Sequence, residues 1–299
     1  MVDIGGRGLH LNLTPATSGP AVILEAGLAA TSLSWALVQP AIGEFARVAS
    51  YDRAGLGESD DATLPATSLN AVQDLHLLLE RAGIPGPYIL VGHSFGGLIV
   101  RLFQQLHPDL VAGLVLVDPV VRSQWRDPDE RHRLMLARGV QLSRRGAFLA
   151  RIGVVRFALQ RLTSGSHKVP GFMGRLFAGQ ASGVANRLVG EVRKIPRELW
   201  PAIAAHWSEE RSFRMMAEYL ENLPVSCGQL DEAPTLGDLP ITVLSSANAS
   251  ADALAEHRHE AGLSTRGEHL VVPDTGHWIN LDAPEAIVEA VRRQVETRL

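Results

Sequence analysis

The chain has 299 residues, of which 46% are apolar and 20% are charged, and its formal net charge is −4. This length and composition predict a sizeable hydrophobic core in one large α/β domain, or in one domain with an inserted lid. The small negative charge gives no general attraction to nucleic acid or to an anionic membrane, so we expect neither as a partner. The single cysteine, Cys227, excludes an internal disulfide and a cysteine-built metal cluster.

Targeting and metal-binding patterns are also missing from the sequence. No run of eighteen apolar residues occurs, and the first thirty residues lack the pattern of a secretory signal. We therefore expect a soluble, cytoplasmic protein. His257 and His259 form an isolated His-x-His pair with no third ligand nearby, so we expect no metal, and no motif calls for a cofactor.

Short apolar runs in the first 120 residues alternate with amphipathic segments. Such runs are typical of strands covered on both faces, and here they span residues 21–24, 47–51, 88–91 and 114–117. The last three runs are separated by two segments with apolar residues at helical spacing, which predict helices over 70–82 and 95–107. This alternation predicts a doubly wound, mostly parallel α/β sheet.

Residues 122–233 break the alternation. They carry 18 of the 28 basic residues but only 11 acidic ones, and their patterns are helical, for example over 141–162. Strand-like runs return at 241–244 and 269–272. A final helix is predicted to begin at Asp282 as N-cap, with Pro284 in its first turn and Glu285 closing a capping box. We therefore predict a core of residues 1–121 and 234–299, with a helical cap at 122–233.

The strongest chemical signal is Gly92-His93-Ser94-Phe95-Gly96, which lies between a predicted strand and a predicted helix. A serine on such a sharp turn holds a strained backbone, and the small residues two before and two after it prevent clashes. The turn lifts the Ser94 hydroxyl above the carboxyl edge of the sheet, where ligands of such sheets bind. We therefore predict that Ser94 is a nucleophile, and we interpret His93 as structural.

A serine nucleophile needs a base and a pair of N–H donors for the developing oxyanion. His277 follows the last predicted strand, which places it at the same sheet edge as Ser94, so we predict that it is the base. The residue after the nucleophile, Phe95, is the candidate for one backbone donor. Leu28, in the loop Glu25-Ala26-Gly27-Leu28 after an early strand, is the candidate for the other.

These features together resemble the α/β-hydrolase superfamily over essentially the whole chain. The resemblance rests on the string GHSFGG around Ser94, on YDRAGLGES at residues 51–59, and on the late pair Gly276-His277. It implies an eight-stranded sheet, a serine–acid–histidine triad and a cap inserted after the sixth strand. One departure is that many relatives have His-Gly in the oxyanion loop, where this chain has Glu25-Ala26-Gly27. A carboxylate there needs a partner, for which Arg53 is the candidate.

Two aspartates are candidates for the acid of the triad. In most of the superfamily the acid follows the seventh strand, but the usual position falls near Asn248 or Ala249, and Asp252 lies about three residues later. Asp118 ends the strand-like run at 114–117, a position that some relatives use for the acid. We favour Asp118 and keep Asp252 as the alternative, because Asp252 also suits the start of a helix.

The serine at the nucleophile position favours transfer of an acyl group to water, and the resemblance favours a carboxylic ester or lactone as substrate. Apolar side chains of the cap are candidates for lining a pocket for a small apolar substrate, and they are Phe148, Phe157, Phe172, Phe177, Trp200 and Trp207. The same triad serves perhydrolases, carbon–carbon bond hydrolases and aminopeptidases, and some chains of this type are receptors. The spacing of the motifs does not separate these enzymes, and the sequence does not indicate an oligomeric state.

Overall fold

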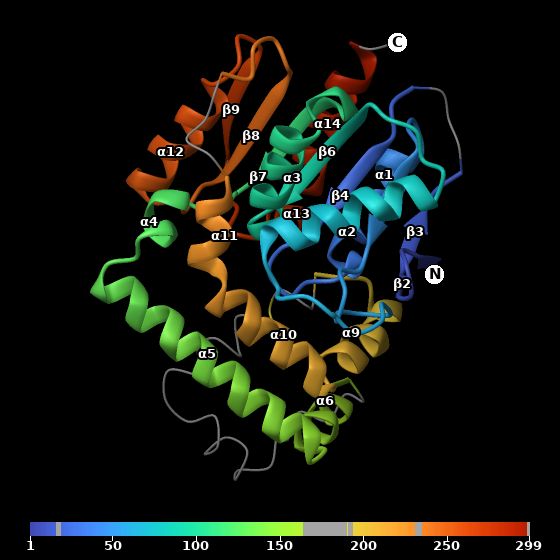
Figure 1. Cartoon of the computed structure of the whole chain (residues 1–299), viewed down its shortest axis with the longest axis vertical. Coiled ribbons are helices and arrows are strands. Elements are labelled where there is room, and N and C mark those ends of the chain that lie inside the picture. Colours follow the sequence, from blue (N-terminus) through green and yellow to red (C-terminus); the bar gives the residue numbers. More distant parts are fainter. Residues whose placement is uncertain (16–18, 164–189, 191–193, 231–234, 298–299) are drawn as a thin grey trace.

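The computed structural model describes residues 1–15, 19–163, 190, 194–230 and 235–297. Its centre is a seven-stranded sheet with the order β3-β5-β4-β6-β7-β8-β9 (Figure 1). Only the pair β3 and β5 is antiparallel, which confirms the doubly wound, mostly parallel fold. The strands are β3 (Leu11–Leu13), β4 (Val22–Glu25), β5 (Val48–Tyr51), β6 (Tyr88–His93), β7 (Val111–Val117), β8 (Ile241–Ser246) and β9 (Gly267–Val272).

The main sheet has one strand fewer, within the described residues, than the eight that the resemblance implied. The first two strands, β1 (Val2–Asp3) and β2 (Gly8–Leu9), form a separate antiparallel ladder with each other. Gly5 and Gly6, which lie between the two strands, have φ angles of 113° and 90°, and these angles let the chain turn back sharply from β1 to β2. The two strands are two residues long and pair with each other, so they do not extend the main sheet.

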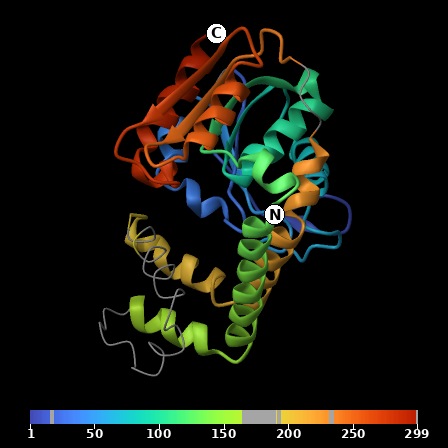
Figure 2. The ribbon, with the colours of Figure 1, turned by 90° about the vertical axis from the view of Figure 1, so that its left-hand side faces the viewer.

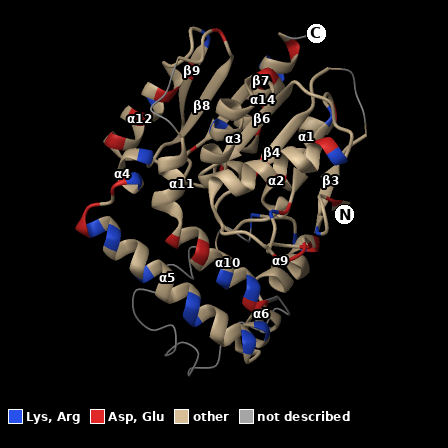
Figure 3. Ribbon diagram, in the orientation of Figure 1, with Lys and Arg blue, Asp and Glu red and all other residues tan. Residues whose placement is uncertain are grey.

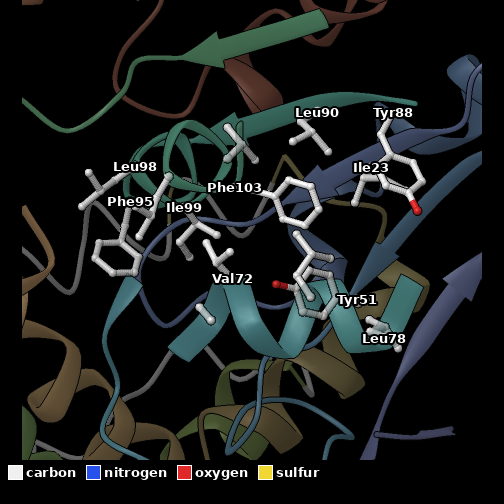
Figure 4. Packing of buried hydrophobic residues seen from close by; sticks show 14 of the residues in the cluster. Ile23, Tyr51, Val72, Leu78, Tyr88, Leu90, Phe95, Leu98, Ile99 and Phe103 are labelled. Atoms are coloured by element: carbon white, nitrogen blue, oxygen red, sulfur yellow. The ribbon is translucent and has the colours of Figure 1, made fainter. Parts of the chain in front are cut away.

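Helices cover both faces of the sheet and bury two layers of apolar side chains. One layer lies under α2 (Ser68–Arg81), α3 (Phe95–Leu106) and α12 (Ala251–Ala261), and Figure 4 shows how Phe103 and Ile99 lie between helix and sheet. The other layer lies under α1 (Gln39–Gly43) and α14 (Pro284–Glu296). The strands between them are buried on both faces, which explains their continuous apolar runs.

The start of the last helix differs from the prediction. Asp282 is the last residue of a short helix, α13 (Ile279–Asp282), and Ala283 occupies the N-cap of α14 without a side-chain hydrogen bond. The predicted capping box with Glu285 is therefore wrong. The carboxylate of Asp282 instead accepts a hydrogen bond of 2.7 Å from the backbone N–H of Gly276, in the loop that carries His277.

Between β7 and β8 the described residues form helices and no strand. The helical pattern predicted over 141–162 belongs to two helices, since Gly153, with a φ of 78°, lies between the end of one and the start of the next. None of the helices in the described ranges is both long and apolar enough to cross a membrane. The helices are α4 (Arg122–Arg126), α5 (Glu130–Arg151), α6 (Val154–Thr163), α9 (Trp200–His206), α10 (Glu210–Glu221) and α11 (Leu223–Gln229).

Of these inserted helices, α5, α6 and α9, drawn in green to yellow, lie at the end of the molecule away from the sheet (Figure 2), and α4 and α11 lie beside the core (Figure 1). The inserted helices contact the core through loops that follow its strands. Arg211 of α10 donates hydrogen bonds of 2.5 and 2.9 Å to the backbone oxygens of Gly57 and Ser59. Ser68, at the start of α2, donates to Gln229 of α11 at 2.8 Å. Basic residues recur along the length of α5 (Figure 3), and several of them are exposed.

Phe103 gives a test of the core. It is fully buried on α3 beside the rings of Tyr88 and His107, whereas Leu106 on the same helix is 44% exposed. We expect Phe103→Ala to lower the free energy of unfolding by about 3–5 kcal/mol, because it removes a buried ring and leaves a cavity. Leu106→Ala, the matched control, should change it by less than about 1 kcal/mol. Urea unfolding measures both, and equal losses would contradict this packing.

Candidate active site

Ser94 lies on a strained turn between β6 and α3. Its φ and ψ angles are 54° and −116°, outside the regions that residues with side chains usually adopt. The neighbouring glycines make the turn possible, because a Cβ atom on Gly92 would lie 2.4 Å from the backbone oxygen of Gly96. A Cβ atom on Gly96 would lie 2.4 Å from the backbone oxygen of Glu25. Both glycines of the motif are therefore required by close backbone contacts.

The structure brings the predicted residues Ser94, His277 and Asp118 together in a line. His277 Nε2 lies 3.0 Å from Ser94 Oγ, and His277 Nδ1 lies 2.7 Å from Asp118 Oδ2. Asp118 directly follows β7, and His277 lies in the loop between β9 and α13. The other carboxylate oxygen of Asp118 accepts a 2.9 Å hydrogen bond from the backbone N–H of Ser246, a contact that the sequence did not indicate.

The environment of Asp118 favours its charged form. Burial opposes ionisation, but the hydrogen bonds from His277 and Ser246 outweigh it and lower the pKa of the carboxyl below its usual value. An ionised Asp118 only accepts hydrogen bonds, so Nδ1 of His277 donates to it. In a neutral imidazole that tautomer leaves Nε2 free to accept the hydrogen of the Ser94 hydroxyl.

Asp252, the alternative acid, lies elsewhere. It occupies the first turn of α12 with an exposed side chain, and within the described part of the chain no hydrogen bond or ion pair joins it to His277. The N-cap of α12 is Ser250, whose hydroxyl accepts from the backbone N–H of Ala253 at 3.2 Å. Asp252 thus stands where a carboxylate suits the positive end of a helix dipole.

His93 supports His277 from behind. Its Nε2 donates a 2.8 Å hydrogen bond to the backbone oxygen of His277, and the two rings lie 4.9 Å apart. Burial, together with the neighbouring His277, lowers the pKa of His93 to about 3. His93 is therefore neutral around pH 7 and acts as a fixed hydrogen-bond donor to the loop of His277.

The predicted oxyanion donors flank Ser94. Phe95 is the first residue of α3, where backbone N–H groups have no partner inside the helix. The loop of Leu28 approaches closely, since a Cβ atom on Gly27 would lie 3.6 Å from Ser94 Cβ and 3.0 Å from His93 Nδ1. Neither the Leu28 nor the Phe95 N–H donates a hydrogen bond to another residue in the described ranges.

Glu25, in the loop that is predicted to supply an oxyanion donor, is buried and paired. Arg53 Nη1 lies 2.6 Å from Glu25 Oε1, and both side chains are almost fully buried, which confirms the predicted pairing. Tyr51 donates its hydroxyl hydrogen to the other oxygen of Glu25, a contact that the sequence did not indicate. Burial raises the pKa of Glu25 above its usual value, although the charge of Arg53 opposes this shift.

Asp52, the neighbour of Arg53 in the string YDRAGLGES, stabilises the loop of that string through hydrogen bonds to backbone N–H groups. Asp52 Oδ1 accepts from the backbone N–H of Ser32 at 2.7 Å, and Oδ2 accepts from that of Glu58 at 3.0 Å. Gly57 has a φ of 53°, and a Cβ atom there would lie 2.1 Å from Asp52 Oδ2. The aspartate and glycine of this string are therefore parts of one tight turn.

No described group of three or more histidine, cysteine, aspartate or glutamate residues is arranged to hold a metal ion. Both ring nitrogens of His257 have protein partners, at 2.7 Å from Ser245 Oγ and 2.9 Å from the backbone oxygen of Pro119. His257 thus braces the segment that follows Asp118. His259 is exposed on the opposite side of its helical turn.

Four of the six aromatic residues that were predicted to line a pocket lie within the described residues. Phe148 on α5 and Phe157 on α6 are 62% and 43% exposed, so neither side chain is enclosed in the interior. α5 buries its small residues Ser143, Ala147 and Ala150, so Phe148 lies off the buried face of that helix. Trp200 and Trp207 are half-buried, and Phe172 and Phe177 lie outside the described residues.

Comparisons with known proteins establish the family. The model of the alpha/beta hydrolase family matches residues 22–290, so the chain belongs to this family of hydrolases. The uncharacterized protein YqjL of Bacillus subtilis is 31% identical over 133 residues, which are 44% of this chain and 53% of that protein. The sn-1-specific diacylglycerol lipase ABHD11 of Mus musculus is 26% identical over 91% of this chain and 80% of its own length.

Several alignments with curated relatives are partial: the chain spans about half the length of YqjL, 32% of an AB hydrolase superfamily protein of Gibberella zeae and 18% of the probable transporter efuK of Hormonema carpetanum. Solved structures match over nearly the whole chain and confirm the fold. DBJA (mutant dbja delta) has a TM-score of 0.71 at 17% identity and covers 99% of this chain and 97% of its own. An esterase from Thermogutta terrifontis has a TM-score of 0.63 at 20% identity, with 97% and 94% covered. The enol-lactonase from Burkholderia xenovorans LB400 has a TM-score of 0.60 at 18% identity, with 97% of each chain covered.

The low pKa of His93 predicts a dependence of stability on pH. The folded protein keeps His93 neutral down to about pH 3, whereas the unfolded chain protonates it near pH 6.5. Stability from this group is therefore present above pH 6.5 and is lost as the pH falls from 6.5 toward 3. Between pH 7.5 and 5 the loss from this one group should be about 2 kcal/mol.

We expect His93→Gln to remove that loss, so that its free energy of unfolding falls less steeply between pH 7.5 and 5 than that of the wild type. Urea unfolding at the two pH values gives the difference. His259→Gln, which replaces an exposed histidine, should follow the wild-type slope. Parallel curves for His93→Gln and the wild type would contradict a neutral, buried His93.

Proposed function

We propose that this protein hydrolyses small carboxylic esters or lactones through an acyl-enzyme formed on Ser94. The observation that carries the proposal is the line of hydrogen bonds in which His277 lies 3.0 Å from Ser94 Oγ and 2.7 Å from Asp118 Oδ2. These distances lie within the reach needed for proton transfer from a nucleophile to its base, and for orientation of that base by an acid.

In the first half of the reaction Ser94 Oγ attacks the carbonyl carbon while His277 Nε2 takes its proton. The carbonyl oxygen becomes an oxyanion, which accepts hydrogen bonds from the backbone N–H groups of Leu28 and Phe95. Each such donor stabilises the transition state by about 3–4 kcal/mol by mutational precedent. Asp118 holds His277 in the required tautomer and stabilises its positive charge.

Collapse of the tetrahedral intermediate breaks the bond to the alcohol oxygen, which takes the proton from His277 and leaves. A lactone keeps its alcohol on the same molecule. Water then attacks the acyl-enzyme, with His277 as base, and releases the carboxylic acid and free Ser94. Side chains, backbone N–H groups and water suffice for this sequence of steps.

Two observations support an ester or lactone as the substrate class. The nucleophile is a serine hydroxyl, which forms an acyl-enzyme rather than an alkyl ester on a carboxylate. An esterase and an enol-lactonase also share the fold. The helices inserted between β7 and β8 contact the loops near Ser94, which supports a cap at 122–233 as the border of a small apolar acyl or alcohol pocket.

Ser94→Ala tests the nucleophile. We expect it to abolish turnover of p-nitrophenyl esters of varied chain length and of several lactones, because the attacking atom is gone. The unfolding midpoint should stay near that of the wild type, since loss of one hydroxyl leaves no large cavity. A fluorophosphonate should label Ser94 in the wild type, as located by peptide mass spectrometry. Labelling at another serine would overturn the assignment.

The two candidate acids are separated by Asp118→Asn and Asp252→Asn. We expect Asp118→Asn to lower kcat by up to about 10⁴-fold, because an asparagine favours the wrong tautomer of His277. Asp252→Asn, the matched control on an exposed helix turn, should keep kcat within about twofold. The reverse ranking in steady-state ester hydrolysis would show that the acid follows β8 rather than β7.

A further inference from the structure

One guanidinium, that of Arg53, holds the loop from Glu25 to Leu28. Arg53 Nη1 donates to the backbone oxygen of Ala26 at 2.8 Å and to Glu25 Oε1 at 2.6 Å. Its Nη2 donates to the backbone oxygen of Gly27 at 2.5 Å. Three consecutive residues of the loop are thus bound by one side chain that is only 3% exposed.

The contact with Gly27 bears directly on the proposed donor. The Gly27 oxygen and the Leu28 N–H belong to the same peptide unit, which is planar and, like nearly all such units, trans, so they point in opposite directions. Fixing the oxygen toward Arg53 therefore fixes the direction of the N–H. Gly27 has no side chain to do so itself, and a Cβ atom there would lie 3.0 Å from His93 Nδ1, which leaves little room for one.

We propose that Arg53 is a positioning residue for ester hydrolysis, which orients the Leu28 N–H toward the oxyanion by holding the peptide between Gly27 and Leu28. This inference rests on the function proposed above. A hydrogen bond from a charged donor is shorter and stronger than one between neutral groups. It also polarises the shared peptide, which makes the Leu28 N–H a better donor.

The surroundings of Arg53 explain why an arginine suits this place. Its planar fork reaches both backbone oxygens and Glu25 at once, which a lysine ammonium does not match in geometry. The guanidinium lies 4.9 Å from the ring of Tyr219 on α10 and 5.7 Å from the ring of Phe95. Glu25 supplies the negative charge that a buried cation requires. Arg53 thus contacts the residue that carries the second oxyanion donor as well as the loop of the first.

The test uses Arg53→Lys, which keeps a cation beside Glu25 but removes the fork. The readouts are kcat and KM for the best ester, and inhibition by two ketones with the same acyl chain. A trifluoromethyl ketone accepts Ser94 Oγ at its carbonyl carbon and places an oxyanion where the donors lie. The corresponding methyl ketone occupies the site largely without this addition.

We expect kcat to fall by at least about tenfold, and by no more than the roughly 10²–10³-fold cost of losing a whole donor. KM should stay within about threefold, and the inhibition constant of the trifluoromethyl ketone should rise by a factor similar to the loss in kcat. The methyl ketone should bind within about threefold of its wild-type affinity. The double variant Glu25→Gln/Arg53→Met, which removes both charges together, should behave in the same way and serves if the lysine variant does not fold.

Arg101→Lys is the matched control. Arg101 is also a buried arginine paired with a carboxylate, Glu260, but it lies two turns along α3 from Phe95. It should leave kcat and both inhibition constants within about threefold. Unchanged kcat in the Arg53 variants would overturn the inference, as would equal weakening of both ketones. Failure of the wild type to be labelled at Ser94 would instead overturn the proposed function itself.

Discussion

The hydrogen-bond ladder of the sheet continues one residue past the ends of two strands, and the geometry of the site depends on this continuation. The backbone N–H of Ser94 donates to Val117 at 2.9 Å, and that of Asp118 donates to Leu244 at 2.7 Å. Both residues have positive φ angles, a conformation that costs about 1–3 kcal/mol for a residue with a side chain. The ladder therefore holds Ser94 and Asp118 in strained conformations at fixed separation, each tied to the neighbouring strand.

His277 is held differently, because it comes from a loop rather than from a strand end. Three hydrogen bonds fix that loop. His93 donates to the His277 backbone oxygen, Asp282 accepts from Gly276, and Thr275 donates to the Val272 oxygen at 2.7 Å. The imidazole can then meet Ser94 and Asp118 together without strain in its own backbone, since His277 is not among the described residues with positive φ. Ser94 and Asp118 are thus positioned by their strand ends, and His277 is positioned by the hydrogen bonds of its loop.

The sequence predicted Ser94 and His277 because their signals are local. A strained turn demands small neighbours at fixed spacing, and a residue after the last parallel strand falls at the same edge as the nucleophile. It also favoured Asp118, because that residue ends a predicted strand at a position that some relatives use for the acid. The sequence indicated neither Tyr219 nor the break at Gly153, because both depend on how distant helices pack. Asp282 was misread for the same reason: its carboxylate binds a loop instead of its own helix.

The pairing of Glu25 with Arg53 connects the loop after β4 to the inserted helices. Glu25 is itself the departure from the His-Gly pair that many relatives have in this loop. A buried carboxylate in the oxyanion loop requires a cation, and the arginine that supplies it lies between that loop and α10. Tyr219 packs against Arg53 and also meets Phe95 edge to face at 5.3 Å. His206 at the end of α9 lies 3.4 Å from the backbone oxygen of Ala29, just beyond Leu28. The helices that border the site therefore pack against the supports of both proposed oxyanion donors. A change at residue 219 would alter the packing around Arg53, so the packing of the inserted helices and the position of the loop from Glu25 to Leu28 constrain each other.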